Sequence, residues 1–411
     1  MSKKRKMLVI APYGFNDRMT NFIEFVSARL LARSGWDVAA IVQSDTGISA
    51  KEIVSGITVY RYAHSLGGLR MLLPFLLFSR PSIFHAHNLR NNRVGIIGAM
   101  LARLLRIRLI CTEYGLLHDH YLTDFRDNPL NNSLHPERVI RNLRELIGGI
   151  GRDPSHWLYI LSSYFFHWPL AHAHHLVFVS KHNLPIAREL KLPSASYLPH
   201  ISDEYRWLET KTDTPDAREE DIKKRISGLY GTNVLFIGQM KLRKGWDVLL
   251  RSIPHTSPAD IAKFVIVSAS TTSEQKEFSD LVDLLNIRDR VLFLGKVPGN
   301  TLLQKIYGIC AVVAVPSRYE GFGLVPLEAF EMRKPVVASN VAALTEYLVN
   351  GENSLLVPPE NPQALGEALS RAVRDAVLRE RLIKGGKETL TRLRSKEYAD
   401  RWLAFYESQL R

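Results

Sequence analysis

The sequence contains only two cysteines, Cys111 and Cys310, among 411 residues. Each lies beside an apolar segment of strand length, where buried reduced thiols are common, and two cysteines exclude a disulfide scaffold. With 46% hydrophobic and 23% charged residues, the chain can instead build ordinary apolar cores. We therefore expect a globular protein of two or three domains in a reducing, cytoplasmic location.

The sequence also lacks an apolar run long enough to cross a membrane. The purest run, Met71–Phe78, is short and contains Pro74, whereas a transmembrane helix needs about 20 predominantly apolar residues. The basic start Met1–Lys6 is followed by a short strand-like segment without a cleavage pattern, so no signal peptide is expected.

Acidic residues are missing from a long stretch of the first half. Between Ile53 and Thr112 there are eight arginines and no aspartate or glutamate. Residues 1–200 hold 24 Lys and Arg against 13 Asp and Glu, so they carry +11 of the total net charge of +13. Such a field is expected to face an anionic partner or to be merely tolerated. Nucleic acid is not expected, because no recognition motif accompanies the charge.

The apolar run Met71–Phe78 lies between Arg70 and Arg80 within this acid-free stretch. Apolar positions flanked by arginines suit the surface of an anionic membrane, which we expect as a partner on the cytoplasmic face. The alternative is that the leucines and Phe75 of this run pack on a sheet. The arginines would then be solvated or would bind a phosphorylated acceptor.

Apolar segments of strand length alternate with longer amphipathic stretches along nearly the whole chain, which is typical of βαβ units and parallel sheets. The expected strands are Met7–Pro12, Asp37–Gln43, Ile57–Tyr60, Ser82–Ala86, Arg108–Thr112, Leu176–Ser180, Tyr197–Leu198, Val234–Gly238, Lys263–Ser268, Val291–Leu294, Val312–Pro316, Pro335–Ser339 and Ser354–Val357. The polar segment Ser202–Arg225 separates the two series and is expected to be a linker. The pattern predicts an α/β protein with two Rossmann-like, doubly wound domains.

The strongest local motif is Val312–Phe330, in which a buried strand ends at Pro316 and a helix begins near Leu324. Its loop and helix carry the candidate ligand-binding residues, which are Glu320, Gly321, Phe322, Gly323, Leu324 and Glu328. Glycines let backbone amides approach a ligand, and a helix start adds positive potential for a diphosphate. The two carboxylates would bind hydroxyl-rich groups on either side of it. The alternative is a pair of solvated carboxylates at a helix start.

This motif resembles the retaining GT-B glycosyltransferases of family 4, whose E-x7-E signature it matches with Glu320 and Glu328. Further pieces follow in the family's order. The segment Gly238–Gly245 is similar to the diphosphate motif G-R-x-x-x-x-K-G, with Lys244 in the lysine position, and His85-Ala-His87 is similar to the H-x-H strand end of the acceptor domain. The resemblance covers nearly the whole chain and is most specific in residues 234–357.

The resemblance implies transfer of a sugar from a nucleoside diphosphate sugar to a hydroxyl acceptor, with retention of the anomeric configuration. Glu328 would bind the ribose hydroxyls, and Glu320 with the backbone amides of residues 322–324 would hold the sugar hydroxyls. Lys244 would neutralise the leaving diphosphate. His87 would lie near the transferred sugar, or it is a hydrogen-bonded histidine at a strand end. No catalytic nucleophile, metal ion or further cofactor is implied.

The resemblance also implies a domain plan. Residues 1–200 would bind the acceptor, residues 201–395 would bind the donor across a cleft, and a last helix within 396–411 would pack back on the first domain. The acceptor is expected to be lipid-linked or part of a surface glycan. Gly14, in the turn after the first strand, is a candidate to contact a phosphate or the substrate.

Three residues depart from the family's pattern. Gln239 stands where an arginine is usual, with Lys241 and Arg243 as candidates to replace its charge; Tyr114 and His200 stand where histidine and asparagine are usual. Gln239 and Tyr114 keep open the alternative of a non-catalytic protein that binds sugar nucleotides or glycans. A nucleotide-sugar epimerase on the same architecture is a second alternative. The histidines at 118, 120, 172, 174 and 175 have no carboxylate or thiolate at ligand spacing, so no metal site is expected.

Overall fold

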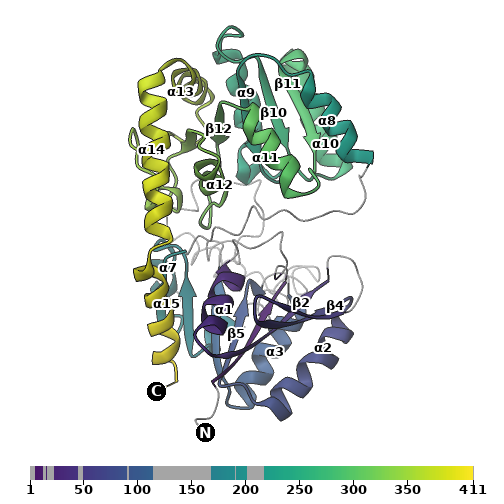
Figure 1. Cartoon of the computed structure of the whole chain (residues 1–411), viewed down its shortest axis with the longest axis vertical. Coiled ribbons are helices and arrows are strands. Elements are labelled where there is room, and N and C mark those ends of the chain that lie inside the picture. The colour runs from purple at the N-terminus through teal and green to yellow at the C-terminus, as the bar shows by residue number, and fades with distance from the viewer. Residues whose placement is uncertain are drawn as a thin grey trace, which may run out of the picture. The chain divides into compact units, whose positions relative to one another are not determined.

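The computed structural model describes residues 5–12, 15, 23–44, 50–89, 92–113, 168–189, 191–200 and 217–410. These residues form two compact units (Figure 1). The first unit contains the described residues up to 200 together with 393–410, and the second contains 217–392. Gly14, Tyr114, His118 and His120 lie outside the described residues.

The first unit is built on an eight-stranded sheet with the order β3-β4-β2-β1-β5-β6-β7-β8. Its strands are β1 (Lys6–Ala11), β2 (Asp37–Gln43), β3 (Ala50–Val54), β4 (Ile57–Tyr62), β5 (Ile83–His87), β6 (Arg108–Glu113), β7 (His175–Phe178) and β8 (Ala195–Tyr197). Its helices are α1 (Ile23–Arg33), α2 (Ser65–Pro74), the π turn η1 (Phe75–Ser79), α3 (Arg93–Leu104), α7 (Asn183–Glu189) and α15 (Lys396–Ser408). All neighbouring strands are parallel except β3 and β4.

The second unit is built on a six-stranded parallel sheet with the order β11-β10-β9-β12-β13-β14. Its strands are β9 (Asn233–Ile237), β10 (Lys263–Val267), β11 (Val291–Gly295), β12 (Val312–Val315), β13 (Val336–Ser339) and β14 (Leu355–Val357). Its helices are α8 (Ala217–Ser227), α9 (Trp246–Ser252), α10 (Thr272–Leu284), α11 (Asn300–Ile309), α12 (Val325–Glu331), α13 (Pro362–Arg374) and α14 (Ala376–Leu393), with short 3-10 turns at Leu242–Lys244, Ile253–His255, Arg288–Arg290 and Leu344–Glu346.

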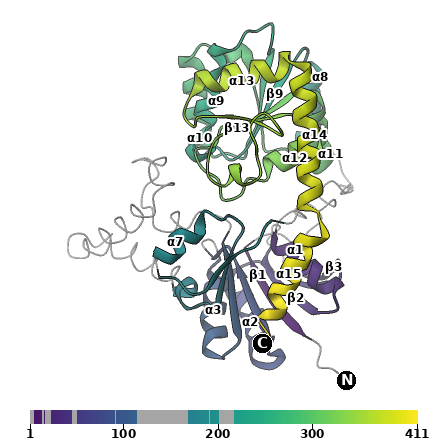
Figure 2. The ribbon, with the colours of Figure 1, turned by 90° about the vertical axis from the view of Figure 1, so that its left-hand side faces the viewer.

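The central strands are apolar on both faces because helices cover both faces of each sheet. In β1, Leu8 and Ile10 join the cluster formed by α2 and α3. The alternating residues Met7 and Val9 are equally buried and face the other side of the sheet, where α1 and α15 lie side by side (Figure 2).

Each sheet has a point where the strand order reverses. In the first unit the chain runs from β1 outward through β2 and then returns to β5 on the other side of β1; in the second it runs from β9 through β10 and returns to β12. Ligands of open α/β sheets bind outside the carboxyl ends of the strands at such points. His87 ends β5, whereas Lys244 and Glu320 follow β9 and β12. The fold therefore places the predicted residues at these two points.

The last helix, α15, packs on the first unit. Nε1 of Trp402 donates a hydrogen bond of 2.9 Å to the carbonyl of Pro199, and the hydroxyl of Tyr406 lies 2.9 Å from Nδ1 of His85. Both aromatic side chains are fully buried. Residues near the end of the chain are therefore part of the core that surrounds β5.

Two elements differ from the sequence prediction. The predicted linker Ser202–Arg225 was wrong in its last part, because α8 begins at Ala217 and buries Ile222 and Ile226 against the second unit. These two isoleucines are four positions apart, as in an amphipathic helix. The many charged residues around them hide this helical spacing in the sequence. The missed strand β3 is exposed and pairs with β4 through a turn in which Ser55 and Gly56 have φ of 52° and 82°. Positive φ at both central residues matches the twist of a tight hairpin.

The apolar run Met71–Phe78 is helical and occupies the end of α2 and the π turn η1. Among the residues that the structure describes, no helix combines the length and the apolar character needed to cross a bilayer.

Candidate functional site

The turn after β9 places Lys244 beside the end of β12. Gly245 has a φ of 68°, and a Cβ atom there would lie 1.9 Å from the carbonyl oxygen of Pro316. Neither the backbone conformation nor the space admits a side chain. The glycine therefore lets the Lys244 turn rest directly on the end of the neighbouring strand.

Lys244 and Glu320 form an ion pair at this place, with 2.5 Å between Nζ and Oε1. The same carboxylate oxygen accepts a hydrogen bond of 2.8 Å from the hydroxyl of Ser317, and a guanidinium nitrogen of Arg243 lies 3.8 Å from Oε2. Glu320 is only 5% exposed. A buried carboxylate is stable here because cations and a hydroxyl surround it.

These contacts set the charge state of the pair. Burial raises the pKa of the Glu320 carboxyl, but Lys244 and Arg243 lower it by more, so the pKa lies below its usual value. Burial, together with the nearby Arg243, lowers the pKa of the Lys244 ammonium by more than Glu320 and Glu328 raise it. The site thus holds a carboxylate and two cationic side chains in a partly dehydrated place, where electrostatic interactions are strong.

Arg318 fixes the two loops to each other. Its guanidinium forms a bidentate ion pair with Asp247 at 2.7 and 2.8 Å, and its Nε lies 2.6 Å from Glu360. Its backbone amide donates to the carbonyl of Arg243. Burial lowers the pKa of Arg318, but both carboxylates raise it by more. The arginine therefore stays charged and orients the turn that carries Lys244.

Tyr347 holds the loop 321–324 through a hydrogen bond and a ring contact. The hydroxyl of Tyr347 donates a hydrogen bond of 2.5 Å to the carbonyl of Gly323, and the Phe322 ring stacks on the tyrosine ring at 4.9 Å. Gly323 has a φ of 86°, and a Cβ there would lie 2.5 Å from Leu344. Burial and the nearby Glu320 and Glu328 raise the pKa of Tyr347, so its hydroxyl remains a donor.

Glu328 lies on α12, behind this loop. It is 4% exposed, and its Oε2 accepts a hydrogen bond of 2.9 Å from the hydroxyl of Tyr307 on α11. Both carboxylates of the predicted motif are thus buried and oriented by neighbouring side chains. Solvated surface carboxylates, the alternative considered from the sequence, would not have these partners.

Gln239, which replaces the usual arginine, is exposed just after β9. Of the two candidates to supply the missing charge, Lys241 pairs instead with Glu274 at a distance of 2.5 Å. Glu274 also closes the capping box at the start of α10. Arg243, the other candidate, lies 3.8 Å from Glu320, beside Lys244.

In the first unit, His87 lies fully buried with its ring centroid 3.9 Å from that of His85. Nε2 of His85 lies 2.7 Å from the hydroxyl of Thr112. Burial lowers the pKa of His85 to about 3 and the pKa of His87 well below its usual value, the latter also because of His85. Both rings are therefore neutral near pH 7.

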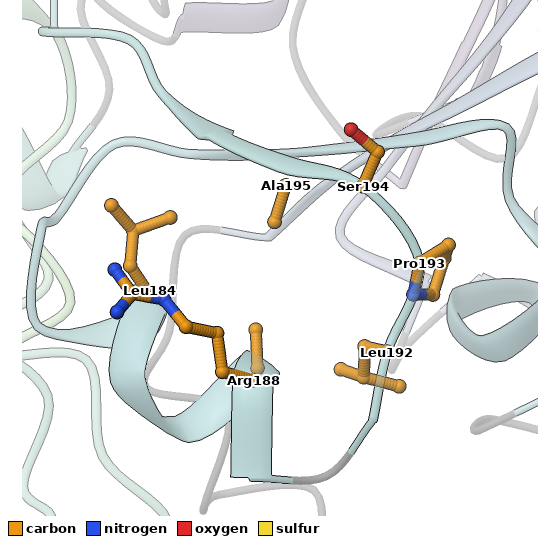
Figure 3. A pocket seen from close by; sticks show the side chains of 7 residues that line it. Leu184, Arg188, Leu192, Pro193, Ser194 and Ala195 are labelled. Atoms are coloured by element: carbon orange, nitrogen blue, oxygen red, sulfur yellow. The ribbon is translucent and has the colours of Figure 1, made fainter.

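Neither a metal-binding cluster nor the pocket of the first unit coincides with the predicted site residues in the described part of the chain. No group of three or more His, Cys, Asp or Glu side chains in the described ranges is arranged to hold a metal ion. A pocket of about 260 Å³ lies in the first unit between α7 and β8, lined by Leu184, Arg188, Leu192, Pro193 and neighbouring residues (Figure 3). It contains none of the predicted site residues.

Comparison with known families decides which kind of domain holds the carboxylate site. Residues 217–389, less than half of the chain, match the family model described as glycosyl transferases group 1. This region is therefore similar to the group 1 glycosyl transferases, and we call it the group 1 domain. The predicted resemblance to GT-B glycosyltransferases is thereby confirmed.

Curated relatives match over a similar length of the chain. An uncharacterized glycosyltransferase of Methanocaldococcus jannaschii is 36% identical over 155 residues, covering 38% of this chain and 39% of its own length. The lipopolysaccharide core biosynthesis mannosyltransferase LpcC of Rhizobium leguminosarum bv. viciae is 34% identical over 169 residues, covering 40% and 47%. The matches thus span less than half the length of these relatives.

Solved structures resemble the whole chain. Sucrose-phosphate synthase from Thermosynechococcus elongatus has a TM-score of 0.66 at 20% identity, covering 98% of this chain and 99% of that one. The Anabaena protein Alr3699/HepE in complex with UDP-glucose has a TM-score of 0.65 at 14% identity, with the same coverage. These likenesses confirm the predicted GT-B fold class.

Reasoning from the sequence missed several side chains that organise the group 1 domain. Arg318 could have been noticed, since it is a charged residue directly after a buried strand. Tyr347 and Tyr307 left no local signal, because each lies 20 or more positions from the backbone or carboxylate group that it holds.

Proposed function

We propose that this protein transfers a sugar from a nucleoside diphosphate sugar to a hydroxyl acceptor. The observation that carries the proposal is the buried contact between Lys244 and Glu320 at the reversal point of the second sheet, inside the group 1 domain. The names of the relatives support it, because they describe a glycosyltransferase and a mannosyltransferase. The complex of HepE with UDP-glucose supports a nucleotide-sugar donor.

In this proposal the residues of the second unit bind the donor. Glu328 binds the ribose hydroxyls, and Glu320 with the amides of residues 322–324 holds the hydroxyls of the sugar. Lys244 and Arg243 turn from Glu320 to the diphosphate when the donor binds. Their positive charge stabilises the leaving group increasingly as the glycosidic bond breaks, which lowers the barrier.

The reaction breaks the bond between the anomeric carbon and the diphosphate oxygen and forms one to the acceptor oxygen. We propose that it proceeds with retention, by attack on the face that the diphosphate leaves, and that the departing phosphate takes the acceptor proton. No protein nucleophile and no metal ion is needed in this scheme. The first unit, residues 1–200 with the last helix, binds the acceptor, and the neutral His87 contacts the transferred sugar.

We propose further that the acceptor is lipid-linked or part of a surface glycan and that the protein works in the cytoplasm. Cys111 and Cys310 are both buried as free thiols, which suits a reducing compartment. Gln239 favours one second candidate, a protein that binds sugar nucleotides without transfer, because an exposed neutral side chain replaces a cation there.

A donor panel tests both candidates. Each nucleoside diphosphate and its sugars is added in a thermal-shift assay, since a ligand that binds the folded state raises the unfolding temperature. The sugars that bind are then incubated with the protein, and release of the nucleoside diphosphate and change of the sugar's configuration are measured. Release of the nucleoside diphosphate supports a transferase, whereas binding without release supports the second candidate. A nucleotide sugar whose sugar has changed configuration indicates an epimerase. If no compound raises the unfolding temperature, the proposal is overturned.

A further inference from the structure

Helix α2 and the π turn η1 are apolar on the side that faces solvent as well as on the side that faces the sheet. Leu72 and Leu76 are buried in the core of the first unit. The exposed large apolar residues are Leu66 (59%), Leu73 (41%), Leu77 (47%) and Phe78 (84%). The exposed positions 66, 70, 73, 74 and 77 follow helical spacing, so they form one stripe in which Arg70 is the sole charge.

Helix α3 lies against α2 (Figure 1) and also exposes apolar side chains. The two helices approach closely at Gly68 and Gly98, where an added Cβ would lie 2.8 Å from Val94 and 2.9 Å from Leu72. On α3, Ile97 is 39% exposed and Leu104 is 77% exposed. We call the surface formed by Leu66, Leu73, Leu77, Phe78, Ile97 and Leu104 the docking face.

Exposed arginines lie in the same stretch of the chain as the docking face. Of the eight arginines in the acid-free stretch, Arg61 pairs with Glu52, Arg108 binds Gln409, and Arg90 lies outside the described residues. The remaining five are exposed and form no ion pair with any residue that the structure describes; they are Arg70, Arg80, Arg93, Arg103 and Arg106. Apolar side chains and cations without an ion-pair partner thus lie on, or within two residues after, the same helical segments.

We propose that the docking face binds the surface of an anionic lipid bilayer. Phe78 and the leucines enter the boundary between headgroups and acyl chains, and the arginines bind lipid phosphates, so both forces that hold a peripheral protein are present. A second copy of the chain is a poor occupant, because a symmetric contact would bring these arginines against each other. The proposal goes beyond sugar transfer and does not depend on it.

Vesicle sedimentation tests the proposal on the full chain. The probes are vesicles of phosphatidylcholine mixed with phosphatidylglycerol and vesicles of phosphatidylcholine alone, at low and at physiological salt. The protein is expected to sediment with the anionic vesicles, less at higher salt, and not with the neutral ones, because salt screens charges near a surface.

Paired variants identify the surface. The double variant Arg70→Glu/Arg80→Glu is expected to weaken binding to anionic vesicles at least about 25-fold, since each basic residue near the surface contributes roughly fivefold. Leu77→Ser/Phe78→Ser is expected to weaken it about tenfold or more. The matched controls are Arg251→Glu/Arg381→Glu and Leu284→Ser/Val377→Ser, which change exposed residues of the second unit and should bind as the unaltered protein does.

The unfolding temperature of every variant is compared first, so that loss of fold is not mistaken for loss of binding. Failure to sediment with anionic vesicles at low salt overturns the proposal, as does equal loss in the control variants. Dimers that the serine substitutions dissociate, without vesicle binding, would mean that a second copy covers the face. If the protein binds anionic vesicles but no compound of the donor panel binds to it, the docking proposal stands and the transferase proposal is refuted.

Discussion

The hydroxyl group of Tyr406 lies 2.9 Å from Nδ1 of His85, so a side chain of α15 meets the strand that ends at His87. The other ring nitrogen of His85 lies near Thr112, and its ring lies against that of His87. His85 is therefore fixed in orientation, and it in turn supports one side of the His87 ring. Through these contacts the last helix takes part in shaping the reversal point of the first sheet.

We expect the buried His85 to make the folded protein less stable in mild acid. Because the pKa of folded His85 is about 3 and that of an unfolded histidine is about 6.5, only the unfolded chain takes up this proton as the pH falls below 6.5. Between pH 7 and pH 5 this costs about 2 kcal/mol of unfolding free energy. Urea unfolding at the two pH values should show a smaller loss for His85→Asn than for the unaltered protein. The control His182→Asn should keep the full loss, and equal losses in all three would contradict the assignment.

The two carboxylates of the second unit should differ in what they control. Glu320→Ala is expected to lower transfer at least tenfold while nucleoside diphosphate affinity stays largely intact, because Lys244 remains to bind the diphosphate. Glu328→Ala is expected to weaken the nucleotide itself at least tenfold, since a hydrogen bond to a charged group contributes about 1.5–3 kcal/mol. Turnover and calorimetric titration are measured for both, with the exposed Glu352→Ala as control. Unchanged turnover in Glu320→Ala would refute its role.

Gln239→Arg should tighten the binding of nucleoside diphosphates. The side chain is exposed at the end of β9, and an arginine there adds one charge-assisted hydrogen bond to a phosphate. Calorimetric titration should show a gain of about tenfold. If the affinity does not increase, Arg243 already supplies the charged contact to the diphosphate. In that case Arg243→Gln should weaken the binding of nucleoside diphosphates.

Gly245→Ala should destabilise the protein by at least about 2 kcal/mol, because the residue has a positive φ and its new methyl group would meet the Pro316 carbonyl. The matched control is Gly308→Ala on α11, where no atom lies within 4 Å of the added Cβ. That substitution should stabilise the helix by up to about 1 kcal/mol. Urea unfolding measures both, and a neutral Gly245→Ala would show that the turn is not fixed on β12.

The sequence was sufficient for the buried strands and for the motif between Glu320 and Glu328. Parallel strands covered on both faces read as continuous apolar runs, and the glycines beside the carboxylates mark where the backbone must turn sharply. The same rules fail for β3, whose exposed edge position needs no apolar pattern. They also fail for α8, which buries two isoleucines among charged residues.

The side chains that orient the site were less accessible to such reasoning. Arg318 meets Asp247 and Glu360 across 71 and 42 positions of sequence, and Tyr347 reaches Gly323 across 24. Contacts of this kind are created by the packing of the sheet and leave no spacing that a single sequence reveals. The apolar run Met71–Phe78 was recognised, but only the fold separates its buried Leu72 and Leu76 from its exposed Leu77 and Phe78.

Helix α15 belongs to the first unit although the whole second unit precedes it in the chain. On the ribosome, the segments that make the second unit therefore emerge in one piece and can fold while synthesis continues. The first unit begins earlier and is completed later, because Trp402 and Tyr406 fill its core only after they have left the exit tunnel. Until then its sheet exposes apolar surface around β5, and apolar surface exposed in a partly folded chain is prone to aggregation.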